Sequence, residues 1–335
     1  MSFRALIERV LQLIPVMLGI SVIVFAMITL TPGDPVDVML DDTISTAEQE
    51  AALRHDMGLD LPVHERFLRF IGNAVTGDFG TSFFHRQPVF DVIMSRVPAT
   101  IELAVFAMII AIGTAVPLGV LAAVRKDSIF DRIATVVSMF GVSMPAFWFG
   151  LLLIMFFAVN LHILPVSGRI GFDSEVPSVT KFILIDSIIA GRLDSFLDAL
   201  KHIILPGVTL GLSMGSILMR VTRTSMLEVL SQDYITFAEA KGISPKRVLG
   251  LHALKNALIP MVTVAALEMG SLLGGSVITE TVFGWPGLGR LVVESIYTRN
   301  YPLVQTAVLL YAVTYLLVNF VADILYTVLN PRVRL

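Results

Sequence analysis

Few residues of this sequence could carry catalytic or metal-binding chemistry. None of the 335 residues is cysteine, which excludes disulfides, thiolate metal sites and thiol nucleophiles. The chain also contains no His-Glu-x-x-His zinc motif and no Gly-x-x-x-x-Gly-Lys-Ser/Thr phosphate loop. We therefore expect that the protein is not an enzyme, that it holds no metal or cofactor, and that any ATP is bound by another polypeptide.

Acidic residues within apolar runs are the remaining chemical signal. Glu268 lies near the middle of such a run, and a charge at the centre of a membrane helix costs about 2.5 to 3.5 kcal/mol. We expect its side chain to face the protein interior, either protonated and hydrogen-bonded or next to a wet pathway. Glu102, Glu280 and Asp323 lie near the ends of apolar runs, where snorkelling or helix capping is the simpler explanation.

Two methionines precede an aromatic pair in the third apolar run. Met139 and Met144, together with Phe147 and Trp148, could line an adaptable cavity that accepts varied side chains. Ordinary packing is the alternative, because most Met and Phe residues in a helix bundle only fill space. Our candidate pathway residues are Met139, Met144, Glu268 and Glu280.

The elements that carry these residues are membrane helices. With 55% hydrophobic and 15% charged residues, the chain is more apolar than a soluble core of this size requires. A bilayer span needs about 20 apolar helical residues, and six runs qualify: 10–33, 103–124, 133–168, 203–219, 257–279 and 302–322. The third run is long enough for one span and an extramembrane tail. We therefore expect an all-α membrane protein with six transmembrane helices.

Basic residues predict the orientation of these helices, because cytoplasmic loops retain Lys and Arg. With the N-terminus inside, the inner segments hold 13 basic residues in 60 positions, whereas the outer segments hold 11 in 125. Both termini are therefore expected in the cytoplasm, and the first apolar run is expected to be an uncleaved anchor. Residues 1–33 would form a tail and the first helix, 34–99 an extracytoplasmic segment, and 100–335 a five-helix core with a cytoplasmic loop at 220–257.

That loop contains start and stop signals for two short helices. Asp233 can cap the first helix, and Gly242 can end it in the left-handed conformation. Ser244 followed by Pro245 would begin a second helix that runs toward Asn256. The formal net charge of −3 gives no sign of a nucleic-acid partner.

One face of the first short helix could dock onto another protein. Tyr234, Phe237, Ala238 and Lys241 follow the i, i+3, i+4, i+7 spacing of a helix that places its side chains in a groove. The alternative is that this face packs on its own helix bundle.

At this loop the residues resemble a family, the membrane subunits of bacterial ABC importers of the dipeptide, oligopeptide and nickel branch. The loop motifs are Asp233-Tyr234, Ala240-Lys241-Gly242, His252-Ala253-Leu254, Asn256-Ala257 and Pro260. Further motifs are Pro32-Gly33-Asp34-Pro35, Gly77-Asp78-Phe79-Gly80, Ser128-Ile129-Phe130-Asp131, Leu164-Pro165-Val166-Ser167-Gly168-Arg169 and Phe283-Gly284-Trp285-Pro286-Gly287-Leu288-Gly289-Arg290. The chain is most similar to the first permease of dipeptide systems. It departs from the broader Glu-Ala-Ala signature, of which only Ala238 matches.

The resemblance implies a type I importer permease in the bacterial inner membrane. Its implied partners are a second homologous permease, two cytoplasmic ATP-binding subunits that use ATP and Mg, an extracytoplasmic substrate-binding protein and membrane lipid. The residues implied to contact the ATPases are Asp233, Tyr234, Phe237, Ala238, Glu239, Ala240, Lys241, Gly242, Pro245 and His252.

The implied cargo is di- or oligopeptides, with nickel complexes, glutathione or oligosaccharides as alternatives. A secondary transporter is the less favoured function, because the sequence has no convincing internal repeat.

Overall fold

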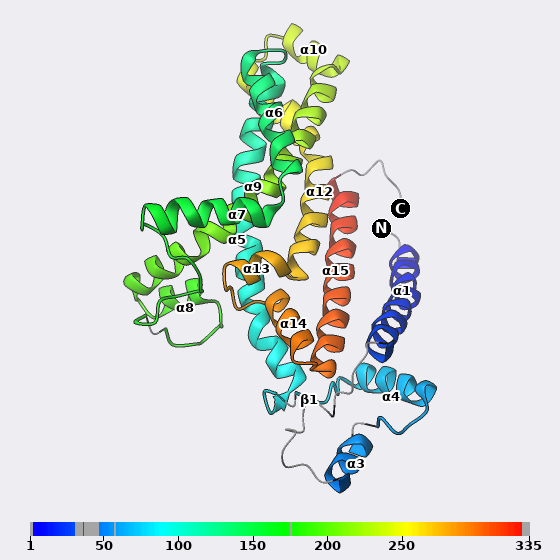
Figure 1. Ribbon diagram of the computed structural model, residues 1–335. Coiled ribbons are helices and arrows are strands. Elements are labelled where there is room, and N and C mark those ends of the chain that lie inside the picture. Colours follow the sequence, from blue (N-terminus) through cyan, green and yellow to red (C-terminus); the bar gives the residue numbers. More distant parts are fainter. Residues whose placement is uncertain are drawn as a thin grey trace.

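Two long helices form the centre of the molecule. The computed structural model describes residues 3–30, 36, 47–56, 58–82, 84–174 and 176–329. Helices α5 (Val89–Val124) and α9 (Leu193–Leu230) pack along each other over most of their length (Figure 1). Their contact consists largely of small residues, because the core cluster contains Ala99, Ala107, Ala111 and Ala115. Small side chains allow two helix backbones to approach closely.

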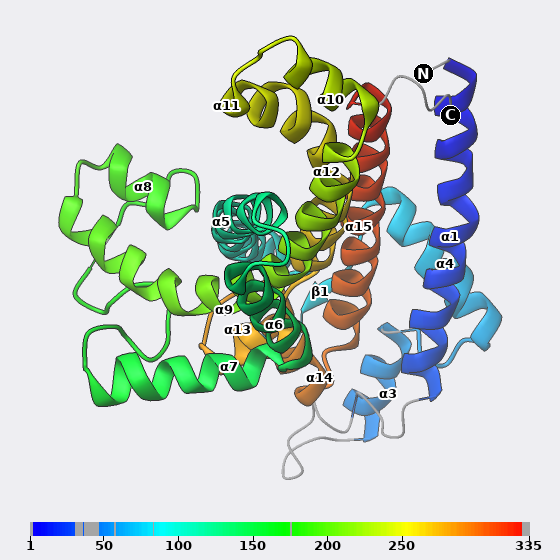
Figure 2. The ribbon, with the colours of Figure 1, turned by 90° about the horizontal axis from the view of Figure 1, so that it is seen from above.

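Three further long helices stand beside this pair. Helix α12 (Lys255–Leu273) packs on α9, α5 and α15 (Tyr301–Leu329), and α1 (Phe3–Leu30) lies along α15. The short helices α3 (Ala47–Asp56) and α4 (Val63–Thr76) follow α1 in the chain. The view in Figure 2 shows α1 and α8 (Ile183–Ile189) on opposite sides of α5. Within the described part of the chain, the strands are β1 (Thr81–Ser82) and β2 (Gln87–Pro88), which form a small antiparallel hairpin.

The helices confirm an all-helical membrane protein in outline. Four of them are long and apolar enough to cross a membrane: α5, α9, the continuous segment Pro245–Leu273, and α15 over Tyr301–Ala322. A fifth candidate is a bent pair. The apolar stretch described in α1, Leu11–Met27, is shorter. Helix α5 begins at Val89, so the expected domain boundary between residues 99 and 100 falls inside a helix.

The third apolar run is not one straight helix. Helix α6 (Ile129–Ser143) is followed by α7 (Ala146–Leu153) and the π-helix η1 (Ile154–Asn160), and the two halves are bent by 103°. The bend occurs at Met144, whose backbone is extended at φ −84° and ψ 126°. Pro145 explains this conformation, because proline disfavours the helical region for the residue before it.

The fifth apolar run also divides. Helix α12 ends at Leu273, and Gly275 adopts a φ of +92° before α13 (Val277–Val282) begins. A separate helix, α14 (Leu288–Tyr297), follows. Glu280 therefore lies on α13 and not at the end of a membrane span.

A buried polar cluster, which we call the α5 anchor, ties these short helices to α5. The Thr100 hydroxyl donates to the Glu280 carboxylate at 3.0 Å, and the Leu288 N–H donates to the Thr100 hydroxyl at 2.8 Å. The indole N–H of Trp285 donates to the carbonyl of Ala99 at 2.8 Å. Glu280 and Trp285 are 0% and 1% exposed. Glu280 is thus neither snorkelling nor at an interface, but it does accept the N–H of Arg290 in the first turn of α14 at 3.0 Å.

The anchor extends through Glu102 to the first turn of α8 and to the segment before it. The guanidinium of Arg169 donates to the Glu102 carboxylate at 2.7 and 2.9 Å, and the Leu184 N–H donates to the same group at 2.9 Å. Arg169 also lies 6.0 Å from the ring of Trp285. Snorkelling is therefore wrong for Glu102, which is buried in an ion pair. The side chain of Asp323, the third acidic residue predicted at a span end, lies outside the described residues.

Candidate functional site

The predicted loop helices are present at the end of α9. Helix α10 covers Asp233–Ala240, and Gly242 follows it with a φ of +77°, as predicted. Asp233 is the first helical residue and not the cap, because Gln232 occupies the N-cap position without a side-chain bond.

The second predicted helix is longer than its pattern indicated. It begins at Pro245 as predicted, but α11 (Pro245–Arg247) continues through the π-helix η2 (Val248–Leu254) into α12. No helix end separates this segment from the apolar helix, so the helix predicted to run toward Asn256 continues past that residue to Leu273.

One face of α10 is buried in its own protein. Ile235 and Ala238 are 2% and 6% exposed, and they pack with Met226 of α9 and with Val248 and Ala253 of η2. We call this cluster the loop core. Ala238 was predicted on the docking face, but its position in the loop core makes it a packing residue of α10.

The adjacent face of α10 is aromatic and exposed. Tyr234 and Phe237 are 42% and 61% exposed, and the Lys241 ammonium lies 4.3 Å from the centre of the Phe237 ring. A cation over an aromatic face stabilises the arrangement modestly. Glu239 and Ala240 are also exposed. This surface, Tyr234, Phe237 and Lys241, is termed the α10 face below.

Hydrogen bonds hold the α10 face against the start of α12. The Asn256 side-chain amide donates to the Tyr234 hydroxyl at 2.9 Å and to the His252 carbonyl at 3.1 Å. Among the predicted loop residues, His252 takes part in this network through its backbone carbonyl. Pro245 is the exposed first residue of α11. Asn256 belongs to a family motif, but no local sequence pattern predicts its bond to Tyr234, which lies 22 positions earlier.

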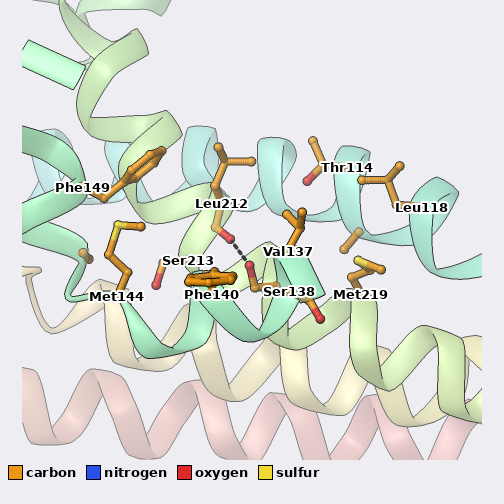
Figure 3. A pocket seen from close by; sticks show the side chains of 15 residues that line it. Thr114, Leu118, Val137, Ser138, Phe140, Met144, Phe149, Leu212, Ser213 and Met219 are labelled. Carbon is orange, nitrogen blue, oxygen red and sulfur yellow. Dashed lines mark hydrogen bonds between the residues drawn. The ribbon is translucent and has the colours of Figure 1, made fainter. Parts of the chain in front are cut away.

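A cavity of about 300 Å³ lies between α5, α6, α7 and α9 (Figure 3). Its walls are mostly apolar and include Met144, Phe149, Leu212 and Met219. The hydroxyls of Thr114, Ser138 and Ser216, which line it, bond to carbonyls of their own helices, for example Ser216 to Leu212 at 2.9 Å. The cavity therefore offers a mainly apolar surface on which these three hydroxyls are already satisfied.

The four predicted pathway residues do not lie together. Met144 lines the cavity, whereas Met139 is 58% exposed on α6 and is not part of its wall. Glu280 is enclosed in the α5 anchor.

Glu268 is half-buried in the middle of α12, two turns after the buried Met261 and therefore on nearly the same face. Within the described part of the chain its carboxylate has no hydrogen-bond or ion-pair partner. That Glu268 faces the protein interior stays a prediction.

Two family models match nearly the whole chain. Residues 115–335 match the binding-protein-dependent transport system inner membrane component, and residues 2–104 match the N-terminal part of such membrane components.

Curated relatives are similar over their full length. The di/tripeptide transport system permease protein DppB of Pseudomonas aeruginosa is 45% identical over 100% of this chain and 99% of its own length. The dipeptide transport system permease protein DppB of Escherichia coli K12 is 44% identical, with 98% of both chains covered. The glutathione transport system permease protein GsiC of Salmonella paratyphi A is 39% identical with the same coverage.

A solved structure shares the fold. An inward-facing MetNI methionine ABC transporter chain matches with a TM-score of 0.52 at 18% identity, covering 72% of this chain and 97% of that chain. At this identity the likeness concerns the fold alone.

The positive φ of Gly242 generates a test of the loop geometry. Gly242→Ala meets no neighbouring atom, so its cost is backbone strain of about 1–2 kcal/mol. We expect the amides of α10 to exchange with deuterium about 5- to 30-fold faster, measured by mass spectrometry on the full chain. Gly250→Ala is the matched control, because it also meets no atom and lies in helical backbone. Equal exchange in both variants would show that the turn does not depend on glycine.

Proposed function

The chain belongs to the family of binding-protein-dependent transport system inner membrane components, and from this premise we propose that it forms half of the pathway of an ATP-driven peptide importer. The observation that carries the proposal is the 45% identity, over the whole chain, to a di/tripeptide permease. Glutathione is a tripeptide, and the 39% identity to a glutathione permease makes it a second candidate cargo.

The α10 face supports a contact with an ATPase subunit. An exposed tyrosine and phenylalanine on a helix of eight residues present an apolar surface that water does not favour. The loop core and the Tyr234–Asn256 bond hold that surface in a fixed position relative to α9 and α12. We infer that this face seats in a cleft of a partner subunit that binds ATP and Mg. A second permease and an extracytoplasmic binding protein would complete the assembly.

The proposed topology has six spans with both termini in the cytoplasm. The four long helices and the bent pair account for five, and α1, with its 28 residues, would be the sixth. The asymmetry of Lys and Arg supports the orientation.

The proposed pathway includes the cavity wall at Met144 and the carboxylate of Glu268, which has no partner among the residues that the structure describes. A flexible thioether suits cargo with varied side chains. An acidic group at membrane depth without a partner is a candidate contact for the ammonium group of a peptide. Met139 would line the pathway only where a partner permease closes it, and Glu280 would contribute by fixing α13 and α14.

Phe237→Asp tests the coupling contact. Seating an unpaired charge in an apolar cleft costs more than the ~1.4 kcal/mol that a factor of ten represents. We therefore expect normal membrane insertion, at least about tenfold weaker retention of the ATPase subunits in pull-down, and a matching loss of dialanine uptake.

The matched control is Thr236→Asp, which adds the same charge at an exposed neighbouring position of α10. In the parent complex, uptake should require ATP and survive collapse of the proton gradient. Uptake driven by the gradient alone would identify a secondary transporter, and full ATPase retention in Phe237→Asp would remove the coupling role of the α10 face.

Introduced cysteines test the topology, since the native chain has none. Phe172 is fully exposed before α8 and Ser244 is exposed in the loop after α10. In intact cells an impermeant thiol reagent should label Phe172→Cys, and it should label Ser244→Cys only after the membrane is opened. The reverse pattern would show that the orientation is inverted.

Two substitutions test the pathway. Glu268→Leu should leave the complex assembled but lower dialanine uptake about tenfold, with Glu268→Gln intermediate, because glutamine keeps the polar contact and loses the charge. Met144→Trp should lower uptake of diphenylalanine more than that of dialanine, because the larger ring reduces the cavity. Glu65→Leu, at an exposed acid on α4, is the control. Unchanged uptake in both pathway variants would exclude these residues from the pathway.

A further inference from the structure

An ion pair joins the first turn of α6 to α9. The guanidinium of Arg223 donates to both carboxylate oxygens of Asp131, from Nε at 2.5 Å and from Nη2 at 2.7 Å. Asp131 is 3% exposed, and it also accepts the N–H of Asp127 at 3.0 Å. Its own N–H donates to the hydroxyl of Ser128, the N-cap of α6. A two-point guanidinium–carboxylate pair fixes both distance and direction between the two helices.

The position of this pair connects it to the coupling loop. Arg223 lies two turns before Leu230, the last residue of α9, and α10 begins three residues later at Asp233. A helix without a break transmits displacement along its axis, and α9 has no interruption between Arg223 and Leu230. Any movement of α10 that displaces the end of α9 therefore reaches the ion pair.

Helix α6 has few buried residues. Its buried residues in this structure are Asp131 and Ser138, and Ile133, Val136 and Phe140 expose half or more of their surface. Phe130 and Ala134 of α6 pack against the core cluster, and Gly141 lies next to Ser216 of α9. Around Gly141, α6 and α9 form walls of the cavity that Met144 also lines.

We propose that the Asp131–Arg223 pair makes α6 follow α9, so that movement of α10 changes the shape of the cavity. Asp131 and Arg223 are thus positioning residues for transport, and this role rests on the proposed function of the chain as an ATP-driven permease. Without either partner, the charge of the other residue is left unpaired, and α6 loses this attachment to α9.

A double-mutant cycle in the reconstituted complex tests the proposal. Arg223→Gln and Asp131→Asn should each lower the dialanine transported per ATP hydrolysed by at least about fivefold, a typical lower value for coupling between sites. The double variant should be no worse than either single one, because both changes break the same link. Arg223→Lys should recover part of the ratio by keeping the charge. Arg220→Gln, an exposed arginine one turn earlier on α9, should leave it unchanged.

A distance measurement separates this proposal from the proposed function. Spin labels at Val136→Cys on α6 and Leu212→Cys on α9 should report one narrow distance that is the same with and without ATP. Adding Arg223→Gln should broaden this distance. A narrow distance in that variant, or additive losses in the cycle, would overturn the role of the pair. Failure of the parent complex to import dialanine, with the distances behaving as expected, would instead overturn the peptide cargo.

Discussion

The close approach of α5 and α9 is the constraint on which the other elements depend. A Cβ atom added at Gly211 would lie 2.8 Å from the carbonyl oxygen of Ala107, and one at Gly119 would lie 2.8 Å from that of Met219. Both distances are shorter than real contacts, so larger side chains would separate the helices. In an apolar membrane, packing of this kind replaces the hydrophobic effect as the source of helix association. The packed helices α5 and α9 carry a cluster at each end. The α5 anchor lies at one end, and the loop core and the Asp131–Arg223 ion pair lie at the other.

Buried carboxylates such as Asp186 and Glu102 hold neighbouring segments together, because each accepts several hydrogen bonds from donors around it. Asp186 on α8 shows the principle outside the membrane helices: burial opposes its ionisation, but hydrogen bonds from Thr180 and from the N–H groups of Val179 and Lys181 outweigh that effect and lower its pKa. The Glu102 carboxylate is held in the same way by Arg169 and the Leu184 N–H. Such groups are costly when unpaired, so they favour a single arrangement of the segments they join. Glu268 has no such donors among the described residues, which is why it is the acidic side chain best suited to a changing contact.

Local patterns predicted the parts of the structure that local physics controls. The turn at Gly242 and the helix start at Pro245 follow from backbone preferences, and both are confirmed. The buried partners of Glu102 and Glu280 lie 67 and 180 residues away in the chain, so no spacing rule could identify them. Helical spacing grouped Ala238 with Tyr234 and Phe237, but it could not say where the boundary between the buried and exposed faces of α10 lies. That boundary depends on Met226 and Val248, which belong to other segments. The bend at Met144 had a local cause in Pro145, which the count of apolar residues in the third run did not take into account.

The continuity from α11 to α12 limits how the loop can move. π-helical turns are rare and are frequently found at functional sites, and η2 lies between the loop and the apolar helix that carries Glu268. Because the backbone bonds continue through η2, α10 cannot shift against α12 without breaking the loop core or the Tyr234–Asn256 bond. At the N-terminal end of α10, only two residues separate it from α9. A displacement of α10 is therefore shared between α9, which is joined to α6 through Arg223, and α12, which carries Glu268. A single contact at α10 can in this way act on the cavity and on Glu268 together.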